Sequence, residues 1–242
     1  MHEYETFAYL DVPKTGSSFI SYMLQTYCSE EQLFFKKHKG VENRYDANKF
    51  YFISVRDPLD QYISLYSSGC AGGGSLYRRL EKRGYGDFYD STWKGFRKWL
   101  KFVLDPENGK YLGARTTTYA GPLHQILGYQ SYRYLELAVV DPDTALANCK
   151  TKDDVRQAYK TAGIAKDVVR HETFRDDLKR LVTGRLRGSF ANLDDTLDFL
   201  EKDVKVNASD RVDQLTDDPT LNRKSRDHVE EREWFLKETF GY

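Results

Sequence analysis

Two apolar, strand-like runs near the start of the chain, each followed at once by a turn and a helical pattern, most constrain its fold. The first run covers residues 7–12, is broken by Pro13, and gives way to apolar residues at helical spacing from 17 to 27. The second run, 50–55, is rich in aromatic and β-branched residues and stops before Arg56. Strands that alternate with helices predict an α/β fold with a central parallel sheet flanked by helices.

The helix after the second run has recognisable start signals. Asp57 is an expected N-cap, and Pro58 suits the first helical position, where a missing N–H costs nothing. Leu59, Ile63 and Tyr66 follow at helical spacing and should form the buried face of this helix.

The remaining chain predicts fewer regular elements. We expect a third buried strand at 135–140 and a fourth at 168–170, the latter followed by a helix at 176–183. The glycine-rich stretch 69–75 is typical of a mobile loop, and we interpret 70–135 as a helical or loop insertion rather than an independent domain.

Composition limits the class of protein. The 242 residues suit a single domain, 1–242, and 37 Lys+Arg balance 37 Asp+Glu, so we do not expect a polybasic nucleic-acid binder. No apolar run approaches the ~20 residues of a membrane span, and the first residues lack a signal-peptide pattern. Three widely spaced cysteines without a CxxC pair indicate reduced thiols, so we expect a cytoplasmic protein without a metal site.

A short polar segment between the first strand and the first helix carries the chemistry, and it reads Asp11-Val12-Pro13-Lys14-Thr15-Gly16-Ser17-Ser18. A strand–turn–helix unit aims backbone N–H groups and the positive helix end at one small volume, which suits phosphate or sulfate. Gly16 lets the backbone approach an anion, three hydroxyl side chains add donors, and Lys14 adds charge. Because Lys14 precedes the only glycine, the segment is not a GxxxxGK[ST] loop. An ordinary capped helix start beside a surface lysine is the alternative.

A second segment places Arg56 at the end of a strand and Ser64 eight residues later on the next helix. Ligands of open parallel sheets bind beyond the carboxyl ends of the strands, so Arg56 is expected on the same edge as Lys14. Two separate cations can hold a ligand with two anionic groups, with the guanidinium offering a planar fork to a phosphate. Alternatively, Arg56 pairs with Asp60 and Ser64 merely faces solvent.

The two segments, PKTGSS at 13–18 and VRDPLDQYISLY at 55–66, resemble the 5′-phosphosulfate loop and the 3′-phosphate motif of sulfotransferases. These enzymes use 3′-phosphoadenosine 5′-phosphosulfate (PAPS), and the variant here is most similar to their carbohydrate-type branch. Weaker similarities to the same family follow at 168–174, 204–209 and 240–242. The resemblance implies a P-loop-like sulfotransferase fold.

It also implies a reaction, the transfer of a sulfuryl group from PAPS to a hydroxyl or an amine of a glycan or small molecule. The product would be 3′,5′-bisphosphoadenosine, and no metal is required. Lys14 matches the family lysine that steadies charge on the bridging oxygen during in-line displacement. The resemblance assigns donor binding to Pro13, Lys14, Thr15, Gly16, Ser17, Ser18, Arg56 and Ser64.

The general base is the least defined part of this expectation. His38 lies between the two motifs, where several carbohydrate-type relatives place a catalytic histidine, and three neighbouring lysines disfavour its cation. A solvent-exposed histidine in a basic loop is an equal alternative. Glu172, His124 and His171 have less support, and His228 is expected on the surface.

The acceptor side is expected in the segment 69–101, where eight Lys+Arg stand against three Asp+Glu. Trp93 and Trp99 could stack on sugar rings there, although an amphipathic helix with its tryptophans in the core explains each residue, taken singly, better. A P-loop-type nucleotide kinase and a non-catalytic nucleotide-binding module are the two other classes of protein that stay open.

Overall fold

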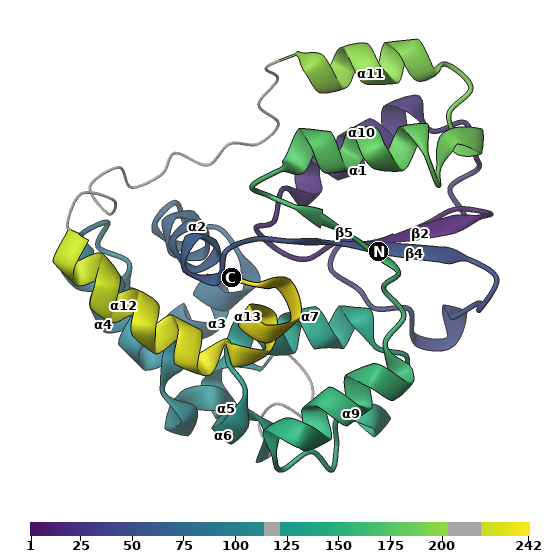
Figure 1. Cartoon of the computed structure of the whole chain (residues 1–242). Coiled ribbons are helices and arrows are strands. Elements are labelled where there is room, and N and C mark those ends of the chain that lie inside the picture. Colours follow the sequence, from purple (N-terminus) through teal and green to yellow (C-terminus); the bar gives the residue numbers. More distant parts are fainter. Residues whose placement is uncertain (114–121, 203–218) are drawn as a thin grey trace. The chain divides into compact units, whose positions relative to one another are not determined.

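The computed structural model describes residues 1–113, 122–202 and 219–242, with the backbone alone at 219–222 (Figure 1). The chain forms two compact units, each built from segments that are far apart in the sequence. The first unit comprises the described parts of Met1–Arg56, Leu137–Asp141 and Gly163–Ala208. The second comprises the described parts of Asp57–Glu136, Pro142–Ala162 and Ser209–Tyr242. A single domain over 1–242 stays a prediction.

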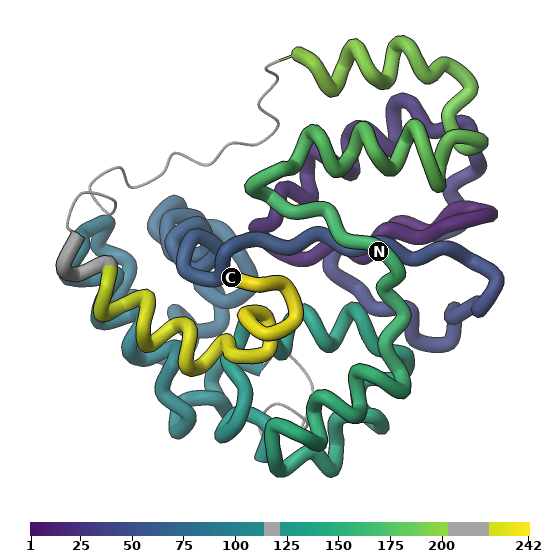
Figure 2. The backbone as a smooth tube through the Cα atoms, viewed as in Figure 1, coloured from purple at the N-terminus to yellow at the C-terminus, as the bar shows by residue number. Residues whose placement is uncertain are grey.

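A five-stranded sheet forms the centre of the first unit, as far as the structure describes it, in the order β3-β1-β2-β4-β5. Its strands are β1 (His2–Glu3), β2 (Phe7–Leu10), β3 (Phe34–Phe35), β4 (Phe50–Val55) and β5 (Asp167–Arg170). β2, β4 and β5 are parallel, whereas β1 runs antiparallel to both of its neighbours. The predicted central parallel sheet is therefore confirmed, with an antiparallel extension at one side. Figure 2 shows β4 and β5 side by side, although the chain passes through the second unit between them.

Two helices, α1 (Ser17–Tyr27) and α10 (Phe174–Thr183), cover one face of this sheet, and α11 (Leu193–Glu201) packs on these two helices (Figure 1). Two short 3₁₀ turns, Glu42–Arg44 and Arg187–Ser189, complete the unit. The helical spacing of apolar residues in α1 gives this helix an apolar side that packs on the sheet. Ile20 and Met23 on this side are fully buried in one core with Tyr9, Phe52 and Val169. Each such burial contributes roughly 1.5–3 kcal/mol to folding. The predicted helix at 17–27 is confirmed.

The second unit is helical throughout its described part. It contains α2 (Pro58–Cys70), α3 (Ser75–Glu81), α4 (Trp93–Leu104), α5 (Gly109–Leu112), α6 (His124–Ile126), the main part of α7 (Tyr129–Ala138), α8 (Pro142–Ala145), α9 (Lys152–Ala162), α12 (Pro219–Arg232) and α13 (Trp234–Phe240), with 3₁₀ turns at Gly86–Phe88 and Pro106–Asn108. No helix in the described ranges is long and apolar enough to cross a membrane.

The start of α2 confirms the capping prediction. The Asp57 carboxylate accepts the N–H of Asp60 at 3.0 Å, and Pro58 is the first helical residue. A second interaction, which the sequence did not predict, comes from Arg226 on α12, whose guanidinium donates to the other Asp57 oxygen at 2.8 Å. The expected buried face is also confirmed, since Leu59, Ile63 and Tyr66 are at most 5% exposed.

The predicted third strand at 135–140 is wrong. These residues form the end of α7, followed by one isolated bridge between Val139 and Gly163. The reason is that Leu135, Leu137 and Ala138 are all fully buried, and a short, mostly apolar run with one charged residue, Glu136, has no period that distinguishes a strand from a buried helix.

Other boundaries differ by smaller amounts. The non-helical part of the glycine-rich stretch 69–75 is shorter than the loop expected there, because α2 continues through Cys70 and α3 begins at Ser75. The helix predicted at 176–183 begins at Phe174, and the strand before it is confirmed as β5. Within the predicted insertion, 114–121 lies outside the described residues, as does the similarity at 204–209.

Candidate active site

The turn between β2 and α1 has the geometry of an anion-binding loop. Gly16 is the N-cap of α1 and has a φ of 86°, a left-handed conformation that glycine adopts without steric cost. A methyl group at Gly16 would also lie 2.5 Å from the ring of Phe174, so packing and backbone conformation both require glycine here. Lys14 itself has a φ of 66°, which costs a non-glycine residue about 1–2 kcal/mol.

Four consecutive backbone amides of this turn carry no intramolecular bond. In the described part of the chain, the N–H groups of residues 15–18 donate to no acceptor. The first turn of α1 also contains no acidic residue and no side-chain cap. Exposed N–H groups at the positive end of a helix dipole attract an anion, and the preceding residue, Lys14, adds a formal charge to the same place.

A second cation joins this loop from the neighbouring strand. Arg56 follows β4, is 7% exposed, and donates from its guanidinium to the carbonyl oxygen of Lys14 at 3.4 Å. Burial lowers the pKa of Lys14, and the charges of Arg56 and Lys37 lower it further. The structure thus brings Lys14 and Arg56 together as the sheet topology predicted, and their mutual repulsion favours a multiply charged anion beside them.

Ser64, the second predicted contact of the 3′-phosphate, belongs to the other unit. It lies on α2 and is almost completely buried. Its approach to the donor loop stays a prediction.

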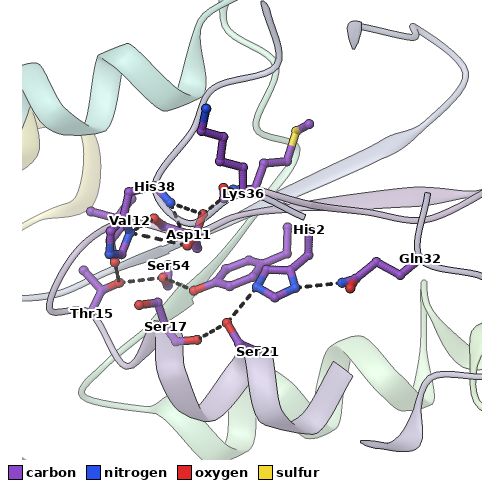
Figure 3. Close-up of polar contacts among 12 residues, drawn as sticks. His2, Asp11, Val12, Thr15, Ser17, Ser21, Gln32, Lys36, His38 and Ser54 are labelled. Atoms are coloured by element: carbon purple, nitrogen blue, oxygen red, sulfur yellow. Dashed lines mark hydrogen bonds and ion pairs between the residues drawn. The ribbon is translucent and has the colours of Figure 1, made fainter. Parts of the chain in front are cut away.

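The hydroxyl of Thr15 does not serve as the anion donor that the sequence suggested. It is fully buried and donates to the carbonyl oxygen of Val12 at 2.8 Å, and it also contacts the Ser54 hydroxyl at 2.6 Å (Figure 3). The side chain turns into the protein because these partners lie inside, so only the backbone N–H of Thr15 is offered to a ligand. In the first turn of α1, the backbone carbonyl oxygen of Ser17 accepts a hydrogen bond from the Ser21 hydroxyl at 2.7 Å.

His38 is held beside the same loop by Asp11. Its backbone N–H donates to both carboxylate oxygens of Asp11, at 3.0 and 2.9 Å, which holds His38 at a φ of 57° (Figure 3). Its ring Nδ1 lies 2.7 Å from the carbonyl oxygen of Asp11. Since a carbonyl can only accept, Nδ1 carries the proton of the neutral ring and Nε2 carries the lone pair.

The electrostatic setting of His38 differs from the one expected from its lysine neighbours. An Asp11 carboxylate oxygen lies 3.4 Å from Nδ1, and this negative charge favours the imidazolium rather than opposing it. Asp11 is fully buried and also pairs with the Met1 ammonium group. The arrangement allows the ring to take a proton on Nε2 while the carboxylate stabilises the resulting cation, as in hydrolase triads.

The other candidates for the general base, which have less support than His38, lie in different parts of the structure. His171 and Glu172 follow β5 and therefore lie at the same edge of the sheet, with the His171 N–H donating to Val55 at 2.9 Å. His124 belongs to the second unit and is half-buried. The expectation that His228 lies on the surface is wrong, because the side chain is half-buried on α12 and burial lowers its pKa.

In the predicted acceptor segment, most of the apolar side chains belong to the core while the basic ones lie at the surface. Trp99 is fully buried and donates from its ring to the Tyr89 hydroxyl at 2.8 Å, so it offers no face to a sugar. All basic residues of the segment are exposed except Arg79, which is half-buried, as is Trp93. The alternative of an amphipathic helix therefore describes α4.

Sequence reasoning missed the polar residues that support the loop, namely His2, Tyr9, Asp11 and Ser54. A signal for Ser54 was present, since one hydroxyl in the otherwise apolar run 50–55 requires a buried partner. Asp11 follows an apolar strand, so its carboxylate also requires a buried partner. Among the described residues, no group of three or more His, Cys, Asp or Glu side chains could hold a metal ion.

Comparison with known families agrees with this geometry. The model of the sulfotransferase family matches residues 1–197, which contain the loop, His38, Arg56 and Ser64. Because the match covers most of the 242 residues, the chain belongs to the sulfotransferase family. No curated protein and no solved structure matches significantly.

Proposed function

We propose that this sulfotransferase uses PAPS as its donor and transfers the sulfuryl group to a hydroxyl, or an amine, of a glycan or small-molecule acceptor. The observation that carries the proposal is the set of backbone amides at 15–18 that donate to no acceptor in the described part of the chain, next to two cations, the half-buried Lys14 and the buried Arg56. A ligand with several anionic groups satisfies both the amides and the cations, which a single carboxylate would not.

The residues present fit such a donor. The amides of 15–18 would bind the phosphosulfate, supported by Pro13, whose ring restricts the turn. Lys14 would hold the charge that develops on the bridging oxygen, and Arg56 with Ser64 would bind the 3′-phosphate. When bound, PAPS supplies an activated sulfuryl group whose S–O bond to the 5′-phosphate breaks as the new S–O bond forms, leaving 3′,5′-bisphosphoadenosine.

His38 would act as the general base in this scheme. Its Nε2 would accept the proton of the acceptor hydroxyl, and Asp11 would orient the ring and stabilise the imidazolium. The acceptor is proposed to be a carbohydrate because of the resemblance to the carbohydrate-type branch, with Arg78 and Arg97 available to anionic groups. All three cysteines are free thiols, which favours a reducing, cytoplasmic compartment.

The decisive experiment is transfer of labelled sulfate from PAPS to a panel of glycans by wild type and Lys14→Ala. We expect the variant to lose at least about 100–1,000-fold in kcat, the effect of removing one donor of transition-state stabilisation. Lys166→Ala removes an exposed lysine of the same unit and should leave turnover unchanged. Retained turnover in Lys14→Ala would contradict the mechanism.

His38→Ala tests the base separately. The variant should bind 3′,5′-bisphosphoadenosine as tightly as wild type but lose about 100–10,000-fold in kcat, together with the acidic limb of the pH–rate profile. An unchanged pH profile would assign the base to another residue.

A metal-free thermal-shift titration distinguishes the alternatives. A sulfotransferase should be stabilised by 3′,5′-bisphosphoadenosine without metal. Stabilisation by Mg-ATP alone would indicate a nucleotide kinase, and bisphosphate binding without transfer to any acceptor would indicate a non-catalytic module.

A further inference from the structure

Three buried hydroxyl groups form a continuous chain beneath the donor loop. The Tyr9 hydroxyl on β2 lies 2.6 Å from the Ser54 hydroxyl on β4, which lies 2.6 Å from the Thr15 hydroxyl in the loop. Thr15 donates in turn to the carbonyl oxygen of Val12 at 2.8 Å. All three side chains are 0% exposed, and Figure 3 shows the link between Ser54 and Thr15.

The direction of this chain follows from counting protons, because each hydroxyl has one. The proton of Thr15 is committed to a carbonyl, so Thr15 must accept the proton of Ser54. Ser54 must therefore accept from Tyr9, the donor at the start of the chain. Burial raises the pKa of the Tyr9 phenol well above its ordinary range, which keeps its proton in place.

The position of the chain connects it to ligand binding. Its two last members, Val12 and Thr15, bracket Pro13 and Lys14, and the bond between them closes the turn in which Lys14 is left-handed. The undonated amides begin at Thr15. Whatever sets the orientation of Thr15 therefore also sets the direction of these amides and of Lys14.

A purely structural explanation is less economical. Ser54 lies between the apolar Ile53 and Val55, and an alanine at this position would bring no hydroxyl of its own into the core. Burying a hydroxyl group costs free energy unless the group is hydrogen-bonded. The hydrogen bonds of Ser54 are therefore the best guide to why a serine stands at this position. Its bonds join the neighbouring strand β2 to the loop.

We propose that Tyr9, Ser54 and the Thr15 side chain act as one unit that holds the turn in its anion-binding conformation, and that Ser54 and Tyr9 are positioning residues for a donor they do not touch. The donor is the phosphosulfate nucleotide of the proposed function, on which this inference rests. The amides of the loop are then pre-organised, so binding does not have to order them.

A double-mutant cycle with Ser54→Ala and Thr15→Val tests the unit. The Kd of 3′,5′-bisphosphoadenosine is measured by calorimetry, and amide hydrogen exchange without ligand is measured at Phe19 and Ile20, whose N–H groups donate to the Gly16 carbonyl oxygen at 3.0 and 3.3 Å. Each single variant should weaken binding and speed exchange about tenfold, the usual effect of one broken buried hydrogen bond. The double variant should resemble either single one, because a chain is broken only once.

Two further variants separate positioning from general loss of stability. Thr15→Ser keeps the hydroxyl and should bind within about twofold of wild type. Thr196→Val removes an equally buried hydroxyl in the same unit, one that donates to the Asn192 carbonyl at 2.9 Å on α11. It should lower the urea midpoint without changing the Kd of the bisphosphate.

The outcomes separate the two proposals. Wild-type affinity and wild-type exchange in Ser54→Ala, or losses that simply add in the double variant, would overturn the positioning unit while leaving the proposed function intact. If wild type does not bind the bisphosphate, the proposed function is wrong, and the positioning of a donor is overturned with it. Faster exchange in Ser54→Ala would then show only that the chain orders the turn.

Discussion

His2 provides a pH-dependent test of the hydrogen-bond network under α1. The side chain on β1 is fully buried, and its Nδ1 accepts from the Gln32 amide at 3.0 Å (Figure 3). Its Nε2–H donates to the Ser21 hydroxyl at 2.7 Å, which donates to the Ser17 carbonyl in the first turn of α1. This arrangement uses a neutral imidazole, because a second ring proton would face the NH₂ group of Gln32.

Burial lowers the pKa of His2 to about 4 from its ordinary value of 6.5, with Asp11 opposing and nearby cations reinforcing the shift. Above pH 6.5, His2 is neutral in both the folded and the unfolded chain and causes no change in stability. Between pH 6.5 and 4, the unfolded chain takes up a proton that the folded chain refuses, so stability falls as the pH falls. The full loss is about 3 kcal/mol, of which about 2 kcal/mol is lost by pH 5.

The assay is urea unfolding of wild type and His2→Gln at pH 7.5, 6.5, 5.5 and 5. His2→Gln lacks the titrating group, so the difference in free energy of unfolding between the two proteins isolates the histidine. Between pH 7.5 and 5, wild type should lose about 2 kcal/mol of unfolding free energy relative to His2→Gln. A difference that stays constant within about 0.5 kcal/mol would refute the reasoning and show that His2 is protonated in the folded protein.

Two further substitutions test packing. Gly16→Ala combines a left-handed backbone with a clash against Phe174 and should cost about 1–3 kcal/mol in thermal unfolding, whereas wild-type stability would show that the turn relaxes freely. Glu233, fully buried in the second unit, accepts the Tyr62 hydroxyl and the Ser131 N–H and hydroxyl, the latter two at 2.7 and 2.6 Å. Glu233→Ala removes the shared acceptor of these buried donors and should cost at least about 2 kcal/mol in urea unfolding. Unchanged stability would show that water replaces the carboxylate.

Local sequence signals predicted the elements on either side of the loop at 11–16. The helix at 17–27 and the strand at 50–55 were correct because a period of 3.6 or a dense β-branched run is a property of neighbouring residues. The cap at Asp57 and Pro58 was correct for the same reason. The prediction for 135–140 failed because a run this short and this apolar has no clear period that distinguishes a helix from a strand.

Parallel strand order also allowed one non-local prediction. Once β2 and β4 are recognised as parallel strands, the residues after them must lie at one edge, and Arg56 does contact the backbone of Lys14. Which side chains reach one another below that edge could not be predicted, because it depends on register and on rotamers.

The sequence by itself determined the α/β pattern, the position of the turn between the first strand and the first helix, and the membership of the chain in the sulfotransferase family. Only the tertiary structure decided that the Thr15 hydroxyl points inward to Ser54, that Asp11 holds His38, and that His2 is neutral beneath α1. The physical reason is that these contacts join residues 39, 27 and 19 positions apart. Burial there removes water as a partner, so each polar group must find one across the fold rather than along the chain.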